Sequence, residues 1–153
     1  MINLLSAEDA FAEALQLYNK HDFGTSVPYF LHAMRSIDKG SFHENEYLAA
    51  YGLCLIRLGN KDEGFNKCLI AAEAELKNPE VFALLARASI LMSRRRIAIK
   101  AISQGLVIEP QYAKLRNLRN ELGVRREPLF GFLSRDNILN IAFGKLLYMI
   151  SNT

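Results

Sequence analysis

The chain has 153 residues, half of them hydrophobic and 23% charged, and its formal net charge is +3. This length and composition suit one ordinary domain with a real core, which excludes an intrinsically disordered protein. No run of about 18 apolar residues occurs, and the start of the chain lacks the basic and apolar parts of a secretory signal, so we expect neither a membrane span nor a signal peptide. Two well-separated cysteines are typical of reduced thiols, so we expect a cytoplasmic protein.

Helix start and stop signals recur along the chain, whereas strand signals do not, so the sequence predicts an all-α fold of antiparallel helical hairpins. Glycine, proline and short polar turns interrupt the helical pattern at each boundary. The seven predicted helices cover residues 7–20, 24–38, 42–58, 61–76, 79–93, 94–108 and 111–122.

Four of the predicted helix starts carry an N-cap residue, whose side chain accepts a hydrogen bond from the backbone of the first turn. The predicted N-caps are Ser6, Ser41, Asn60 and Asn78. An acid stands three residues after each of the first three, as in a capping box. Pro79 directly follows the fourth, at the first helical position, where its missing N–H costs nothing. Gly59 is expected to be a left-handed cap and Gly123 to stop the last of these helices, whereas Pro28 is expected within the first turn of its helix.

An internal repeat relates three hairpins. A small residue recurs midway along the first helix of each hairpin and again twelve residues later, and two further rows follow four and then three residues on. The four rows are Ala14, Gly52 and Ala86; Ser26, Gly64 and Ala98; Phe30, Cys68 and Ile102; and Ala33, Ala71 and Gly105. The repeats cover residues 7–40, 45–78 and 79–112, with residues 41–44 inserted after the first. Small residues at these points let neighbouring helices approach closely.

The rows resemble the tetratricopeptide (TPR) family over residues 7–122. The resemblance implies a right-handed superhelix of three helix-turn-helix repeats and a capping helix over 111–122, together forming a TPR domain of residues 1–123. Ser26 and Gly64 stand where alanine is usual, Cys68 stands where an aromatic residue is usual, and only the third repeat closes with proline. An unrelated helical bundle is the alternative. In size and layout the chain is similar to small bacterial three-repeat TPR proteins, including the chaperones of type III secretion translocators.

The residues that could carry catalysis or hold a metal are not arranged for either task. His21, His32 and His43 form no i, i+4 pair and have no neighbouring cysteine, whereas a zinc site needs four converging ligands. Cys54 and Cys68 fall on opposite helices of the middle hairpin, and we interpret them as buried packing residues, with a redox pair as the alternative. We therefore expect no enzyme, no metal and no cofactor.

In a TPR array the first helix of each repeat lines the concave side, so the resemblance implies a partner-binding groove there. The expected groove residues are Phe11, Leu15, Tyr18, Ala49, Leu53, Ile56, Ala83, Arg87 and Ile90. TPR domains that grip a C-terminal carboxylate place Lys, Asn and Arg in this groove. The corresponding positions here are Phe11, Leu15, Ala50, Glu80 and Leu84, so the clamp is absent and the groove is apolar. Such a face favours a ligand, although the same residues could instead belong to the core.

Residues 124–153 do not follow the repeat. An apolar linker leads to a helix predicted over residues 138–150, in which ten of the thirteen residues are apolar. A helix that is apolar nearly all round is buried, and thirteen residues are too few to cross a bilayer. We expect this tail to pack on its own domain, in preference to a second copy. The docking residues would be Phe130, Phe132, Leu139, Phe143, Leu146, Leu147 and Ile150.

We interpret the chain as a non-catalytic TPR module that binds a protein or peptide partner, as a scaffold or a chaperone-like adaptor. One alternative is a homo-oligomer, such as a homodimer, assembled through the C-terminal helix. Another is nucleic-acid binding, because residues 1–78 hold seven Lys/Arg and eleven Asp/Glu, whereas residues 79–153 hold twelve and five. The basic residues are scattered rather than aligned on one helix, so nucleic acid is the least favoured partner. They include Arg94, Arg95, Arg96, Lys100, Lys114, Arg116, Arg119, Arg125 and Arg126.

Overall fold

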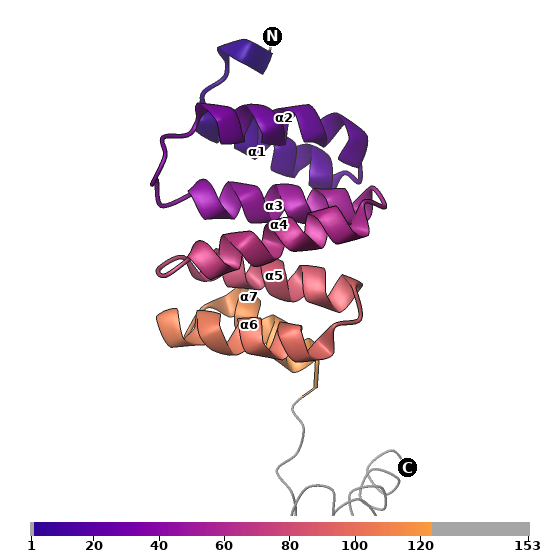
Figure 1. Ribbon diagram of the computed structural model, residues 1–153, viewed down its shortest axis with the longest axis vertical. Helices are drawn as coiled ribbons and strands as arrows, with labels where there is room; N and C mark the ends of the chain where they lie inside the picture. Colours follow the sequence, from indigo (N-terminus) through magenta and orange to yellow (C-terminus); the bar gives the residue numbers. More distant parts are fainter. Residues whose placement is uncertain (1, 124–153) are drawn as a thin grey trace, which may run out of the picture. The chain divides into compact units, whose positions relative to one another are not determined.

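A computed structural model describes residues 2–123 of the chain, and this part is built from helices. A short 3-10 turn, η1, precedes seven α-helices (Figure 1). Their bounds are η1 Ile2–Leu4, α1 Ala7–Asn19, α2 Phe23–Ser36, α3 Glu44–Arg57, α4 Lys61–Ala74, α5 Pro79–Leu91, α6 Arg95–Ile108 and α7 Ala113–Glu121. The predicted all-α class is confirmed for this part of the chain. No helix in this part of the chain is both long and apolar enough to cross a membrane.

The helices pack as three hairpins stacked in chain order, α1–α2, α3–α4 and α5–α6 (Figure 1). The first helix of each later hairpin packs on the second helix of the hairpin before it, α3 on α2 and α5 on α4. The first helices also touch one another, α3 with α5, and α7 closes the series by packing on both α5 and α6. Each hairpin therefore buries its apolar faces against its neighbours along the array.

Close approach of the helices explains the small residues of the repeat. All twelve residues of the four rows are buried. A Cβ atom added to Gly52 would lie 2.6 Å from the carbonyl oxygen of Gly64, and one added to Gly64 would collide with the carbonyl of Gly52. A side chain at Gly105 would collide with Leu115 of α7. Backbone contact between α3 and α4, and the fit of α7 on α6, thus require glycine.

Two predicted helix caps form as expected. The side chain of Ser6 accepts a hydrogen bond from the Asp9 N–H at 3.0 Å, and the side chain of Asn78 accepts one from the Glu80 N–H at the same distance. Gly59 takes the left-handed conformation, with φ +98°, directly after α3. These three positions show that the punctuation of the sequence marks real helix ends.

Two expectations about helix starts are wrong, and a third holds only in part. Ser41 is not an N-cap, because α3 begins at Glu44 and the Glu44 carboxylate instead accepts the Gly40 N–H at 2.7 Å, which orders the inserted turn. Pro28 is the sixth residue of α2 rather than a first-turn residue. Its ring removes the N–H that would bond to the carbonyl four residues earlier, and packing of α2 between α1 and α3 must offset that loss. Asn60 does precede α4, but its side chain makes no cap hydrogen bond.

Candidate functional site

Two adjoining hollows, of about 380 and 280 Å³, lie among the first helices of the hairpins. Their linings share Tyr18 and Asn19 of α1, Leu53 of α3 and Arg87 of α5, so they form one continuous groove. We call the two hollows together the groove. Besides these four residues, its lining includes Leu15, Ala50, Arg57, Glu80, Leu84, Ile90, Leu91, Lys114, Leu118 and Glu121.

Five of the nine predicted groove residues line the groove: Leu15, Tyr18, Leu53, Arg87 and Ile90. The other four, Phe11, Ala49, Ile56 and Ala83, are buried and line neither hollow. Phe11 shows why. Its ring stacks on that of Tyr47, with centroids 3.9 Å apart, and meets the edge of Phe30 at 5.8 Å. Phe11 thus joins the first hairpin to the second.

The sequence prediction missed groove residues one helical turn further along the same face. Asn19, Arg57 and Leu91 follow Leu15, Leu53 and Arg87 by four residues, and all three line the larger hollow. The helical period could have found them, because residues four apart lie on one face. Lys114 and Leu118 were not predicted as groove residues because the sequence analysis treated the helix over residues 111–122 only as a capping helix.

Glu80, one of the two acidic residues that line the groove, is already engaged. Lys114 Nζ lies 2.7 Å from Glu80 Oε1, and the Tyr112 hydroxyl donates a hydrogen bond to Glu80 Oε2. Burial, followed by this hydrogen bond and the nearby carboxylate, raises the pKa of Tyr112, so the hydroxyl keeps its proton. The charge of Glu80 is therefore balanced by groups outside α5, which leaves the arginines of the groove free of it.

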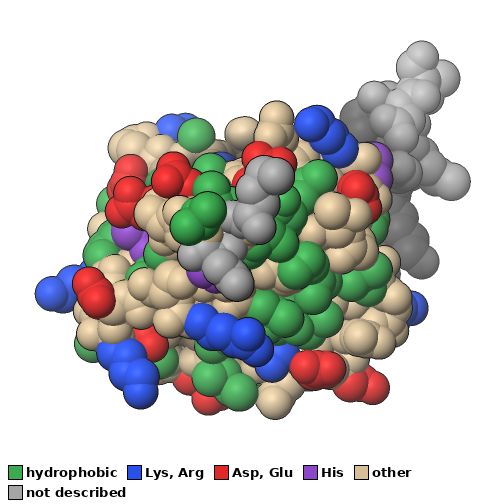
Figure 2. Space-filling model, turned by 90° about the horizontal axis from the view of Figure 1, so that it is seen from above, with side chains coloured by type: hydrophobic (Ala, Val, Ile, Leu, Met, Phe, Trp, Pro, Cys, Tyr) green, Lys and Arg blue, Asp and Glu red, His purple; other side chains and the backbone are tan. Residues whose placement is uncertain are grey.

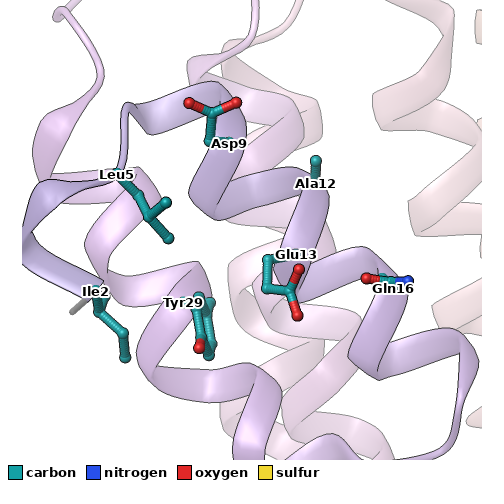
Figure 3. A pocket seen from close by; sticks show the side chains of 7 residues that line it. All are labelled: Ile2, Leu5, Asp9, Ala12, Glu13, Gln16 and Tyr29. Atoms are coloured by element: carbon teal, nitrogen blue, oxygen red, sulfur yellow. The ribbon is translucent and has the colours of Figure 1, made fainter.

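A third hollow, of about 690 Å³, lies at the N-terminal end of the array. Figure 3 shows Ile2, Leu5 and Tyr29 on one side of it, and the polar side chains of α1 on the other. Viewed from this end, hydrophobic side chains reach the surface with acidic ones beside them (Figure 2). The polar residues that line this hollow are Asp9, Glu13 and Gln16 of α1, and Ala12 lies among them.

This end hollow lies where a preceding hairpin would stack. When the hairpins are aligned by the repeat, the polar residues of α1 that line this hollow correspond to apolar or aromatic residues in the later hairpins. Those equivalents are Tyr47, Tyr51 and Cys54 in α3, and Val81, Leu85 and Ala88 in α5, all of them buried. Terminal repeats of such arrays need a polar outer face. We therefore assign the end hollow to the cap of the array and the groove to the candidate site.

The two thiols are packing residues of the hairpins. Cys54 Sγ lies 3.0 Å from Ser26 Oγ, and Cys68 Sγ donates to the Ala49 carbonyl at 3.3 Å. Burial raises the pKa of Cys68 to about 12, and burial raises that of Cys54 despite an opposing hydrogen bond from Ser26. Both are free thiols that stay protonated at neutral pH.

The imidazole groups have structural partners. His32 Nε2 lies 3.0 Å from the Leu5 carbonyl oxygen, which ties η1 to α2, and His43 Nδ1 lies 2.8 Å from Glu46 Oε2. No cluster of three or more His, Cys, Asp or Glu able to hold a metal occurs within residues 2–123. The predicted docking residues Phe130, Phe132, Leu139, Phe143, Leu146, Leu147 and Ile150 lie outside the described part.

No family model and no curated protein matches this sequence. Among solved structures, the chain is similar to the Arabidopsis OM64 TPR domain, with a TM-score of 0.60 and 18% sequence identity. The likeness covers 78% of this chain and 96% of that domain. At this identity it shows a shared fold, a TPR-like helical repeat.

Proposed function

We propose that this chain is a non-catalytic interaction module that binds a segment of a partner protein in the groove. The observation that carries the proposal is the lining of two adjoining hollows by apolar side chains from four separate helices. Leu15, Leu53 and Leu84 come from the first helices of the three hairpins, and Leu118 comes from α7. TPR-like folds generally serve protein–protein interaction, which supports the same conclusion.

The groove offers hollows in which side chains of a ligand could be buried, which a flat surface does not. The two adjoining hollows, which share Tyr18 and Leu53 in their linings, would each accept one large apolar side chain of a ligand. Burying one such side chain is worth about 1.5–3 kcal/mol. Two anchors in fixed hollows, with a polar rim around them, are the usual basis of recognition of a helical or extended segment.

A scaffold or chaperone-like role in the cytoplasm is the finer form of this proposal, and it rests on the sequence resemblance. A module that holds exposed apolar segments of a client would need such an apolar groove. The alternative assignment, a homo-oligomer assembled through residues 138–150, depends on residues beyond the described part.

The proposal is tested by placing a charge in the groove and following partner capture. Full-length wild type is compared with Leu15→Glu and Ile90→Glu in pull-downs from the native lysate, read by quantitative mass spectrometry. Both side chains are only half-buried, so circular dichroism is expected to show an unchanged fold. A partner should be retained by wild type and lost by both variants.

The matched control is Ile70→Glu, which places the same charge on an exposed apolar residue of α4 outside the groove. This variant should retain the partner. Equal capture by wild type and by both groove variants would contradict the proposal.

A further inference from the structure

One position of the groove breaks the apolar pattern of the repeat. Leu15 of α1, Leu53 of α3 and Arg87 of α5 occupy the same place in successive hairpins, by the spacing of the small-residue rows. All three line the smaller hollow, and Leu53 and Arg87 also line the larger one. The groove therefore changes from apolar to basic along the direction of the array.

The guanidinium of Arg87 is available to a ligand. The residue is exposed and forms no ion pair or hydrogen bond within residues 2–123. The nearby Glu80 carboxylate is held by Lys114 and by the hydroxyl of Tyr112. Arg57, in the larger hollow, is likewise exposed, and it adds a second positive charge beside Arg87.

Besides Glu80, one other carboxylate lines the groove. Glu121 of α7 lines the larger hollow and is exposed, so it offsets part of the charge of the two arginines. It does not line the smaller hollow, where Arg87 meets Leu53 and Leu84. An acidic group of a ligand at that point would face a guanidinium with no competing free carboxylate beside it.

We propose that the groove selects segments in which an acidic side chain accompanies two apolar ones. This inference rests on the proposed function and names the class of its ligand. The apolar side chains would lie toward α1 and α3, and the carboxylate would lie toward α5 against Arg87. A guanidinium binds a carboxylate through two parallel hydrogen bonds, which gives the segment a defined direction in the groove.

The expected source of the carboxylate is an Asp or Glu side chain within the segment. The positions at which other TPR domains hold a C-terminal carboxylate include Leu15, Ala50 and Leu84 here. These side chains have no hydrogen-bond donor that could bind the carboxylate of a chain terminus. Arg87 alone supplies one guanidinium fork, which matches one side-chain carboxylate.

Selection from a random peptide library tests this directly. Twelve-residue peptides are displayed on phage as N-terminal fusions, so that none has a free C-terminus, and they are selected on full-length protein. Wild type should enrich peptides with two large apolar residues and a neighbouring Asp or Glu. Arg87→Leu restores the leucine of the other hairpins, so it should still enrich apolar peptides without the acid.

Charge reversal and a matched control complete the selection. Arg87→Glu should shift the enriched residue to Lys or Arg, whereas Arg96→Leu should behave as wild type. Arg96 is exposed on α6 and does not line the groove. For the best synthetic peptide, replacing its acid by the amide should weaken binding to wild type about tenfold and leave binding to Arg87→Leu unchanged.

The outcomes separate the two proposals. Apolar peptides enriched without any acid would overturn this inference and leave the proposed function intact, as would an acid preference that persists in both Arg87 variants. If wild type enriches no apolar peptide, both proposals are overturned.

Discussion

The outer face of α1 and the equivalent faces of α3 and α5 are built on the same repeat yet carry opposite chemistry. Where α3 and α5 stack on a preceding hairpin, their residues are aromatic or apolar and buried. On α1, which no other hairpin covers at this face within residues 2–123, Asp9 and Glu13 occupy those positions. The difference teaches that the presence of a neighbour, and not the helix itself, decides which residue a repeat position needs.

The contacts of the two faces show the difference in detail. Between hairpins, Tyr51 lies over Phe30, with ring centroids 6.5 Å apart, and Cys54 reaches Ser26. At the end, the Asp9 carboxylate accepts a hydrogen bond from the hydroxyl of its own N-cap residue, Ser6, at 2.7 Å. Glu13 stands in the open hollow (Figure 3). The residues between the hairpins are buried, whereas Asp9 at the outer end is exposed.

The test with the largest expected effect places the residue type found on the outer face of α1 at a buried contact between two hairpins. Val81 of α5 is fully buried at the position that Asp9 occupies in α1, so Val81→Asp places a carboxylate in a fully buried site. An uncompensated buried charge costs about 3–5 kcal/mol. Urea unfolding should show this loss in the free energy of unfolding.

The control for Val81→Asp is the opposite change, in which a residue type from a buried contact between hairpins is placed on the outer face of α1. Glu13→Tyr gives α1 the residue that α3 has at this position, Tyr51, and should change the free energy of unfolding by less than about 0.5 kcal/mol. The added apolar surface should instead promote self-association, visible by light scattering at high concentration. Similar destabilisation by both exchanges would show that α1 does not form the end of the array.

A second test concerns the contact within the middle hairpin. Gly64→Val would drive a side chain into the carbonyl of Gly52 and the backbone nitrogen of Ile56, and overpacking of this kind costs about 1–3 kcal/mol. Gly24→Ala is the matched control, because a Cβ atom there meets nothing within 4 Å. The control should be neutral or gain about 0.5–1 kcal/mol. The two variants are compared by thermal and urea unfolding.

The sequence predicted the hairpins well because glycine, proline and N-caps act locally. Ser6, Asn78 and Gly59 have their predicted roles for that reason. The prediction of Ser41 as an N-cap was wrong because the Glu44 carboxylate accepts a hydrogen bond from the Gly40 N–H and orders the turn instead. The sequence around Ser41 looks the same in either case.

The groove was harder to predict, because burial depends on how far apart neighbouring helices stand. Phe11 and Leu15 are one turn apart on α1, yet Phe11 stacks on Tyr47 and Leu15 lines the groove. The spacing of residues on a helix places both on one face but does not say which of them the next hairpin covers. The aromatic ring facing Phe11 belongs to a helix more than thirty residues away.

A third test compares two N-caps. Asn78 is buried; its side chain accepts from the Glu80 N–H and donates to Glu46 Oε2 at 3.0 Å, which links α3 to α5 across the seam. Asn60 is exposed and makes no cap hydrogen bond. Asn78→Ala should lose about 1–2 kcal/mol in urea unfolding, whereas Asn60→Ala should lose much less. Equal losses would mean that neither hydrogen bond of the Asn78 side chain contributes to stability.

The smallest expected effect is a pH dependence at the turn between α4 and α5. Burial of Glu75 would raise its pKa, but hydrogen bonds to its carboxylate from the N–H groups of Lys77 and Asn78, the amide of Asn45 and the N–H of Leu76 outweigh it, so the pKa is lowered. The folded state therefore binds this proton more weakly than the unfolded chain does.

The sign of the effect follows from that lowered pKa. The carboxylate contributes its full stabilisation above the ordinary glutamate pKa of about 4.3, and the contribution disappears as the pH falls through the lower pKa of the folded state. Glu75→Gln should thus be less stable than wild type at pH 7, and the difference should shrink on acidification toward pH 3. Glu73→Gln, at an exposed carboxylate of the same helix, is the control and should follow wild type throughout. A difference between wild type and Glu75→Gln that stays constant with pH would mean that the amide replaces the carboxylate equally well, and that the charge of Glu75 does not hold the turn.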